Sequence, residues 1–381
     1  MQLRLSDVLS ALSDALDLAA GHPRAHAERS CIIGMRLAVE LGLGDDERAS
    51  LFYALLLKDA GLEVASAAGL DAAALDAVAA VNEHWDGRGE PLGAAGDELP
   101  LLGRIVCLAQ TAEAFWELGG SRGACEVARE RSGSWFDPLL VDALCAIEDD
   151  TRFWVSLEIP QVGRWEPSGR VELVGDERLD RVAEAFAMLV DGQSPYTPGH
   201  SRGVATLSVR IAEVMGLGAQ DRRDLHLAGL LHDLGMLGVP GNALDHPGKL
   251  DGEERRRLRM HPKRSLEILS RIWPLRRVAR LAAVHHERLD GSGYFLGLTG
   301  AQLDLPSRVL AVAEVAQGLG ARRSYRNAFP IDDVLWIMSQ GAGTKVDADV
   351  YEALTRVLTG PPALDVVEEV DAEVVHGLQR L

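Results

Sequence analysis

Residues 230–235 read LLHDLG, and residues 285–294 read HHERLDGSGY. Neutral imidazole and carboxylate side chains are the standard protein ligands of Mn, Fe, Zn and similar ions. A His-Asp pair on one helix can give one ligand to each of two metals, or a bridging carboxylate. Two neighbouring metals can in turn bind a phosphate diester and activate water at neutral pH. Each segment alone is a weak signal, but the two in this order favour a dinuclear metal centre.

Histidine is concentrated around these segments. Seven of the eleven histidines lie between His200 and His286. The positions that matter are His200, the His232-Asp233 pair, His261 and the His285-His286 pair. Taken alone, His200 after the turn TPGH is more typical of a capping or core histidine, so the argument for a metal rests on the whole set.

Most of the chain has the periodicity of helices. In 28–42 and 202–216, apolar residues recur at three- and four-residue spacing, and each segment ends at a glycine. The exception is 156–175, which is rich in Pro and Gly and is expected to be a linker with a short strand at Arg170 to Val174. These patterns predict an all-α protein in two parts.

The two sides of the linker resemble each other. AHAERSCIIGMRLAVELGLG (25–44) matches GHSRGVATLSVRIAEVMGLG (199–218), and HWDGRGEPLG (84–93) matches RLDGSGYFLG (288–297). A third match joins SGSWFDPLLVDAL (132–144) to AGTKVDADVYEAL (342–354). We interpret the chain as a duplication whose first copy is shorter.

The first copy lacks most of the candidate ligands. Their counterparts are His26 for His200, Lys58 for His232, Asp59 for Asp233, Val81 and Asn82 for His285 and His286, and Gln110 for Glu314. A lysine ammonium beside Asp59 can replace a metal electrostatically. We therefore predict no metal in the first copy, which leaves packing, dimerisation or binding of a regulator as its roles.

Composition excludes some functions. The formal charge is −18, from 39 Lys+Arg against 57 Asp+Glu, which argues against a nucleic-acid polymer as partner. No uncharged apolar stretch is long enough for a membrane span, and the N-terminus lacks secretory features. The cysteines are not spaced for a metal and are expected to be buried, reduced thiols of a cytoplasmic protein: Cys31, Cys107, Cys125 and Cys145.

The segment from about 176 to 360 resembles HD-GYP domains, the variant of the HD phosphohydrolase superfamily associated with cyclic di-GMP hydrolysis. The resemblance is carried by SPYTPGHS (194–201), LLHDLG (230–235), HPG (246–248), MHP (260–262), HHERLDGSGY (285–294) and LPSRVLAVAE (305–314). It implies two tandem HD-type helical bundles: a degenerate repeat at 1–155, a linker at 156–175, and a metal-dependent phosphohydrolase domain at 176–381.

The resemblance also implies a ligand set. The family's metal ligands fall on His200, His232, Asp233, His261, His285, His286 and Glu314, with His232 and Asp233 also the catalytic residues. Glu314 replaces the usual aspartate. Tyr196 stands where some members have a glutamate that binds a third metal, so two divalent ions (Fe, Mn or similar) are expected.

The substrate side matches the family less well. Residues expected to contact substrate are Tyr294, Arg308, Arg323 and Arg326, although Arg308 is equally typical of an arginine that pairs with a carboxylate. Departures from the family pattern are Met236 in place of lysine, Phe295 in place of proline and Gln317 in place of an acidic residue. The basic run EERRRLR (253–259) is more typical of a solvated helix face.

Three functions follow. The first is a metal-dependent phosphodiesterase for cyclic di-GMP or a related nucleotide, with activity reduced by the departures. The second is a catalytically degenerate protein that binds a nucleotide or a protein partner. The third is a phosphomonoesterase or nucleotidase of the HD superfamily, because fold does not fix the substrate. Homodimerisation through the N-terminal lobe is left open.

Overall fold

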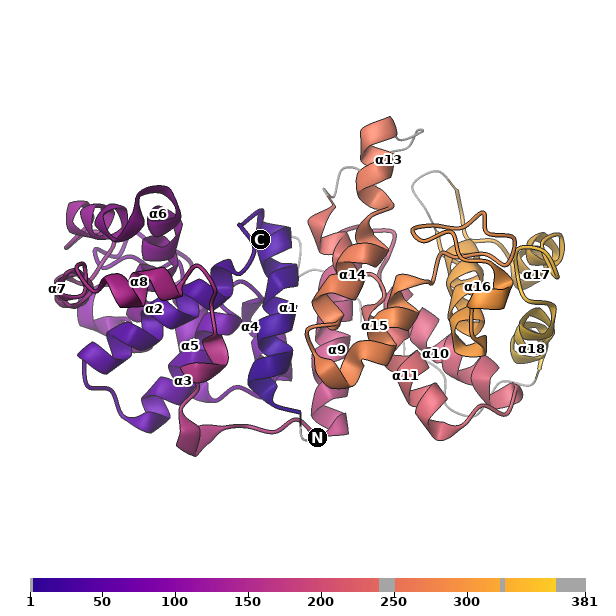
Figure 1. Ribbon diagram of the computed structural model, residues 1–381, viewed down its shortest axis with the longest axis horizontal. Helices are drawn as coiled ribbons and strands as arrows, with labels where there is room; N and C mark the ends of the chain where they lie inside the picture. The colour runs from indigo at the N-terminus through magenta and orange to yellow at the C-terminus, as the bar shows by residue number, and fades with distance from the viewer. Residues whose placement is uncertain (1–2, 240–250, 323–325, 361–381) are drawn as a thin grey trace. The chain divides into compact units, whose positions relative to one another are not determined.

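Helices make up all the regular structure in the described part of the chain. The computed structural model describes residues 3–239, 251–322 and 326–360. Within these residues all helices and strands longer than an isolated bridge are helices (Figure 1). The expected all-α class is confirmed. The chain divides into two compact units: Met1–Ala185 with Ile268–Pro274, and Phe186–Glu267 with Leu275–Leu381.

The first unit is built around α2, which packs against α3 and α6. Its α-helices are α1 (Leu5–Ala20), α2 (His26–Glu40), α3 (Asp45–Leu56), α4 (Gly61–Ala67), α5 (Ala72–Ala79), α6 (Leu101–Glu130), α7 (Pro138–Ala146) and α8 (Thr151–Ser156). Short 3-10 helices are Gly96–Glu98, Val162–Arg164 and Ser168–Arg170. Helix α9 (Asp176–Asp191) begins in this unit and ends in the second.

The second unit is built in the same way around α10, which packs against α11 and α16. Its α-helices are α10 (His200–Val214), α11 (Ala219–Leu231), α13 (Gly252–Leu258), α14 (His261–Leu269), α15 (Arg276–Ala283), α16 (Leu305–Gly320), α17 (Ile331–Ser339) and α18 (Ala348–Thr359). The 3-10 helices are Leu234–Gly238 and Gly300–Gln302. The end of α14 and most of the 3-10 helix Trp273–Leu275 belong to the first unit.

The helices predicted at 28–42 and 202–216 are present as α2 and α10, each beginning two residues earlier than expected. Gly42 and Gly216 follow their last turns with φ of 70° and 73°. This left-handed conformation is strained for residues with a Cβ, so a glycine there ends the helix with little strain.

The segment 156–175 is built into the first unit. The buried Glu166 accepts hydrogen bonds from Ser6 Oγ (2.9 Å) and Tyr53 Oη (2.8 Å). The short strand expected at 170–174 was wrong, because Leu173 forms only a single antiparallel bridge with Arg4. A strand needs a run of paired residues, and here the backbone pairing stops after one bridge.

Matching interactions in the two units support the duplication. In the first unit, the Asp17 carboxylate accepts from Ala27 N at 3.2 Å; in the second, Asp191 accepts from Ser201 N at 3.0 Å. Further along, Arg104 Nη1 lies 2.7 Å from Asp137 Oδ2, and Arg308 Nη1 lies 2.9 Å from Asp347 Oδ2. The spacing is 174 residues for the first pair (191 − 17) and 204 for the arginines (308 − 104), as in the sequence matches.

The structure also bears on the cysteines and on membrane spans. Cys31, Cys107 and Cys125 are buried thiols, as expected, whereas Cys145 is only partly buried. Among the helices that the structure describes, none combines the length and apolarity needed to cross a lipid bilayer.

Candidate metal centre

His200 and Glu314 form one wall of the centre. His200 is the first residue of α10, and it follows Gly199, whose φ of 73° turns the chain into the helix. Glu314 lies on α16, which packs against α10. This packing places Glu314 Oε2 3.1 Å from His200 Nε2. Both side chains are buried.

The His232-Asp233 pair follows α11 directly. His232 is fully buried, and its Nδ1 lies 2.8 Å from the carbonyl oxygen of Gly229. Its Nε2 lies 3.3 Å from Asp233 Oδ2 and 3.4 Å from Glu314 Oε2. An imidazole that donates from Nδ1 to a carbonyl presents the Nε2 lone pair, which is the usual geometry of a metal-binding histidine.

His261 and His285 repeat this arrangement. Their Nδ1 atoms lie 2.7 Å from Leu258 O and 2.5 Å from Ala282 O. Their Nε2 atoms face each other at 3.0 Å. His261 can come this close because residue 235 is glycine: a Cβ there would lie 2.1 Å from His261 O. If both Nδ1 atoms carry the proton, two lone pairs meet, and a cation between them removes the repulsion.

Asp233 joins the two groups of histidines. Its Oδ1 lies 3.1 Å from His261 Nε2 and 3.6 Å from His285 Nε2. Its Oδ2 faces the other group, 3.3 Å from His232 Nε2 and 3.9 Å from His200 Nε2. One carboxylate oxygen is therefore directed to each group, as a bridging ligand requires.

His286 completes the second group. Possible ligand atoms of His261, His285 and His286 all lie within 4.8 Å of one another, as do those of His200, His232 and Glu314. Burial lowers the pKa of His286 to about 4, so this imidazole is neutral at pH 7 and able to coordinate. All seven residues predicted as ligands therefore lie in one cluster.

The cluster has the chemistry of a cation site. His232 Nε2, Asp233 Oδ1 and Glu314 Oε2 are buried and have no hydrogen-bond partner in the described part of the chain. Buried polar atoms without partners are costly, and cations bound in the two groups of ligands would satisfy all three. Histidine nitrogen with carboxylate oxygen is a donor set that suits Mn, Fe or Zn.

Electrostatics within the cluster favour a bound cation. Burial opposes charge on His232, but the carboxylates of Asp233 and Glu314 outweigh it and raise the pKa of His232 well above its usual value. Burial also opposes charge on Asp233, but His232 and His261 hold its pKa well below the usual range. The carboxylates are thus ionised, and they favour either a proton or a metal ion on the imidazoles. Because protons and metal compete for the same nitrogens, acid should weaken metal binding.

Tyr294 and Arg259 extend outward from the cluster. The Tyr294 ring lies over His286, with centroids 4.6 Å apart and planes 32° apart. The Arg259 guanidinium lies 4.9 Å from the Tyr294 ring centroid. Arg259 is exposed and has no ion pair with any described residue. A cation at the outer end of this stack is in a position to meet a phosphate ester.

The other residues predicted to contact substrate lie differently. Arg308 is held by Gly300 O, Leu303 O and Asp347, which is the structural role that its sequence also allowed. Arg326 donates to the carbonyl oxygens of residues 318, 319, 321 and 327. Arg323 and the HPG motif at 246–248 lie outside the described residues. Substrate contact by these arginines stays a prediction.

The three residues that depart from the family pattern, Met236, Phe295 and Gln317, lie in different surroundings. Met236 is buried, so the side chain in place of the family's lysine does not reach the surface. Phe295 packs against the buried residues Ala283, Val284 and Leu303. The Gln317 side chain lies against Gly203 of α10, where a Cβ would come within 2.0 Å of its Nε2.

Sequence reasoning missed Arg259 and Asp191. Arg259 was included in the basic run that was expected to form a solvated helix face. That expectation fits Arg257, which pairs with Glu253 at 2.5 Å, but it does not fit Arg259. Asp191 Oδ1 accepts from Ser201 Oγ at 2.7 Å and so fixes the start of α10. The match between Asp17 and Asp191 at the repeat spacing was the signal that could have found it.

The equivalent place in the first unit is occupied by charged side chains. Lys58 is buried and contacts the Asp59 carboxylate, while His26 Nδ1 contacts Glu113. Possible ligand atoms of His22, His26 and Asp59 lie within 4.8 Å of one another. The Lys58 ammonium already neutralises Asp59 and leaves less negative charge to attract a cation. The absence of a metal in this unit stays our prediction.

Comparison with known proteins identifies similar chains. The HD domain family model matches residues 63–140 and 184–350. A 3′3′-cGAMP-specific phosphodiesterase 3 of Vibrio cholerae is 31% identical over 93% of this chain and 94% of its own length. The cyclic di-GMP phosphodiesterase response regulator RpfG of Xanthomonas campestris is 35% identical over 47% of each chain.

A solved structure has the same fold. The crystal structure of a cyclic GMP-AMP specific phosphodiesterase of V. cholerae matches with a TM-score of 0.73 and 31% identity, covering 95% of this chain and 99% of the other. The likeness therefore spans both units and is not confined to the half that carries the histidines.

Proposed function

The chain belongs to the HD domain family, as a member of its HD-GYP branch, and on this premise we propose that it is a metal-dependent phosphodiesterase that hydrolyses cyclic dinucleotides. The observation that carries the proposal is Asp233, whose two carboxylate oxygens face two separate groups of ligands. Paired metals can clamp the attacking and leaving oxygens of a phosphate diester, and a carboxylate with one oxygen toward each group can hold such a pair together.

Two divalent ions fit these groups. His200, His232 and Glu314 would hold one ion, His261, His285 and His286 would hold the other, and Asp233 would contact both. When bound, such ions neutralise phosphate oxygens and lower the pKa of water. The chain's own part is to fix the ligands, through the Nδ1 contacts with backbone carbonyls, and to exclude water by burying the imidazoles.

Tyr294 and Arg259 provide the substrate side. The half-buried Tyr294 ring can pack on a base, and Arg259 can bind a phosphate with a charge-assisted hydrogen bond. Arg259 thereby supplies the cation that Met236 does not. Because a relative that matches over 93% of this chain is named for 3′3′-cGAMP, we infer that this substrate is preferred over cyclic di-GMP.

The test is turnover by the full chain loaded with Mn²⁺ or Fe²⁺. We expect hydrolysis of 3′3′-cGAMP, slower hydrolysis of cyclic di-GMP, and none of either by Asp233→Asn. Metal content measured on the same samples separates loss of metal from loss of chemistry. Full metal occupancy without turnover of either dinucleotide would refute a phosphodiesterase and favour a nucleotide-binding protein.

A panel of nucleoside monophosphates tests the remaining alternative. Release of phosphate from them, faster than cleavage of cyclic dinucleotides, would assign the centre to a phosphomonoesterase. The homodimer proposed for the first unit is tested separately, by measuring the molecular mass of the purified protein in solution. A protein partner is tested by the same measurement on a mixture of the two proteins.

A further inference from the structure

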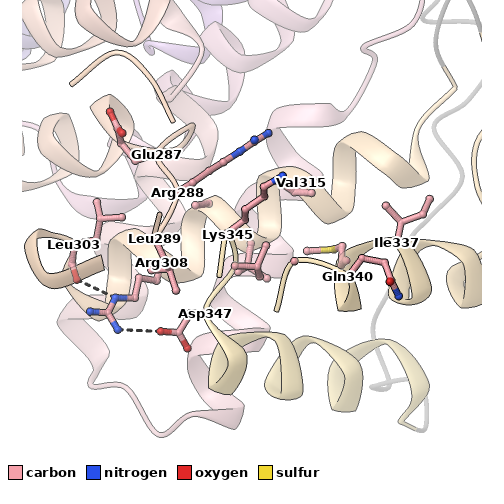
Figure 2. A pocket seen from close by; sticks show the side chains of 15 residues that line it. Glu287, Arg288, Leu289, Leu303, Arg308, Val315, Ile337, Gln340, Lys345 and Asp347 are labelled. Carbon is pink, nitrogen blue, oxygen red and sulfur yellow. Dashed lines mark hydrogen bonds and ion pairs between the residues drawn. The ribbon is translucent and has the colours of Figure 1, made fainter. Parts of the chain in front are cut away.

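A pocket of about 230 Å³ opens beside α16 in the second unit, away from the metal ligands (Figure 2). Its walls are largely apolar and include Leu289, Leu303, Val312, Val315, Ile337 and Val346. None of the residues predicted to bind metal lines it. Val312 and Val315 of α16 face the pocket, whereas Glu314 faces the histidines.

Two cations stand at the edge of this pocket. Figure 2 shows the charged ends of Arg288 and Lys345 extending to the same side. Both side chains are exposed, and neither head group has an ion pair or hydrogen bond to a described residue. Asp290 acts on both electrostatically, but it is itself exposed. Arg308, by contrast, is fully engaged by Asp347 and by backbone carbonyls.

The first unit shows what fits in the equivalent place. Leu289 N donates to Lys345 O at 3.2 Å, and Trp85 N donates to Trp135 O at 3.0 Å. Trp135 is therefore the counterpart of Lys345, and His84, which precedes Trp85, is the counterpart of Arg288, which precedes Leu289.

In the first unit the counterparts of these two cations are rings, on a partly exposed edge of the fold. The indole of Trp135 stacks on the His84 ring, with centroids 4.3 Å apart and planes 18° apart. The Arg131 guanidinium lies 4.0 Å from the indole centroid. A flat bicyclic group beside a cation thus packs at this edge of the fold. In the second unit the corresponding residues are Lys345 and Gly341, and no ring of a described residue stacks at this edge.

We propose that this pocket is a second ligand site, which binds a nucleoside 5′-monophosphate. The purine, a flat bicycle like the indole, would lie against the apolar walls. The phosphate would be bound by Arg288 and Lys345, whose charges have no fixed partner. The site is separate from the metal centre and does not depend on the function proposed for it.

The test is binding of GMP and AMP to the full chain after chelation of metals, measured by calorimetry. Chelation disables the metal centre as a competing site. We expect saturable binding of one nucleotide per chain, and at least tenfold weaker binding by Arg288→Ala and by Lys345→Ala. Lys345→Trp, which removes one cation and places the first unit's indole at the edge of the pocket, should abolish binding. Arg256→Ala, an exposed arginine on α13, is the matched control and should bind as the parent does.

Guanosine separates the two parts of the proposal, since it has the base without the phosphate. It should bind at least tenfold more weakly than GMP. The proposal fails if the chelated protein binds neither nucleotide, if Lys345→Trp binds as tightly as the parent, or if guanosine and GMP bind equally. Failure here leaves turnover of cyclic dinucleotides by the metal-loaded protein untouched, so the two proposals are judged independently.

Discussion

Glu314 Oε2 lies 3.1 Å from His200 Nε2, although the two residues belong to different helices, α16 and α10. Glutamate replaces the family's usual aspartate here, yet its carboxylate still reaches the first group of ligands. The added methylene of Glu314 is thus accommodated, and the substitution does not remove an oxygen from the centre.

Glu314→Gln should weaken binding of one of the two metal ions. The amide has no negative charge, so the His200 and His232 group loses its own carboxylate and keeps only its share of Asp233. Mutation of residues that only support a metal ligand lowers metal affinity by up to about 100-fold. Because Glu314 is expected to be a ligand itself, we expect metal affinity at this group to fall by about 100-fold. Metal titration with Mn²⁺ measures this. Glu314→Asp keeps the charge and should bind more tightly than Glu314→Gln; equal affinities would contradict a ligand role.

Removal of metal should lower the stability of the protein. An ion that binds only the folded chain stabilises it by about 2.7 kcal/mol when present at 100 times its Kd. Chelation should therefore lower the thermal midpoint of the second unit. His285→Ala should show a smaller shift on chelation, because it binds metal less well. A midpoint that does not respond to chelation in the wild-type protein would show that no metal is bound.

Arg259→Ala should raise KM for the cyclic dinucleotide by about tenfold, the effect of one lost charge-assisted hydrogen bond. Metal content should not change, because Arg259 contacts Tyr294 and no predicted ligand. Arg259→Lys should recover part of the loss. Arg256→Ala on α13, the helix that ends just before Arg259, is the control. An effect on kcat alone, with KM unchanged, would argue against a role in substrate binding.

Asp17→Asn should stabilise the first unit at neutral pH. Burial raises the pKa of Asp17 from 3.8 to about 7, although Lys58 opposes the shift. The folded state therefore binds more protons than the unfolded state between pH 4 and 7, so stability falls as pH rises through that window. The loss is complete above pH 7 and amounts to a few kcal/mol at most.

Urea unfolding at pH 5 and pH 8 measures this effect. Asparagine keeps an oxygen that can accept from Ala27 N but does not ionise, so the variant should gain stability at pH 8 and depend less on pH. Asp76→Asn, at an exposed position on α5, should leave the pH dependence as it is. A variant that is less stable than wild type at pH 8 would contradict the burial argument.

Much of the fold was predictable because its signals are local. Helical periodicity and terminal glycines located α2 and α10 to within two residues, since a helix satisfies its backbone within the segment itself. The strand expected at 170–174 was wrong because pairing depends on a partner far along the chain. Arg4 supplies that partner for one residue only.

The sequence by itself determined the all-α class, the internal repeat and the set of residues that could bind metal, because residue type and spacing carry that information. Only the tertiary structure decided how they are used. Packing of α10, α11 and α16, with Ser265 of α14 donating to His232 O, turns the two oxygens of Asp233 toward different groups of histidines. Packing also engages Arg308 within the chain and leaves Arg259 and Arg288 available, since an arginine's partners are set by neighbours distant in sequence.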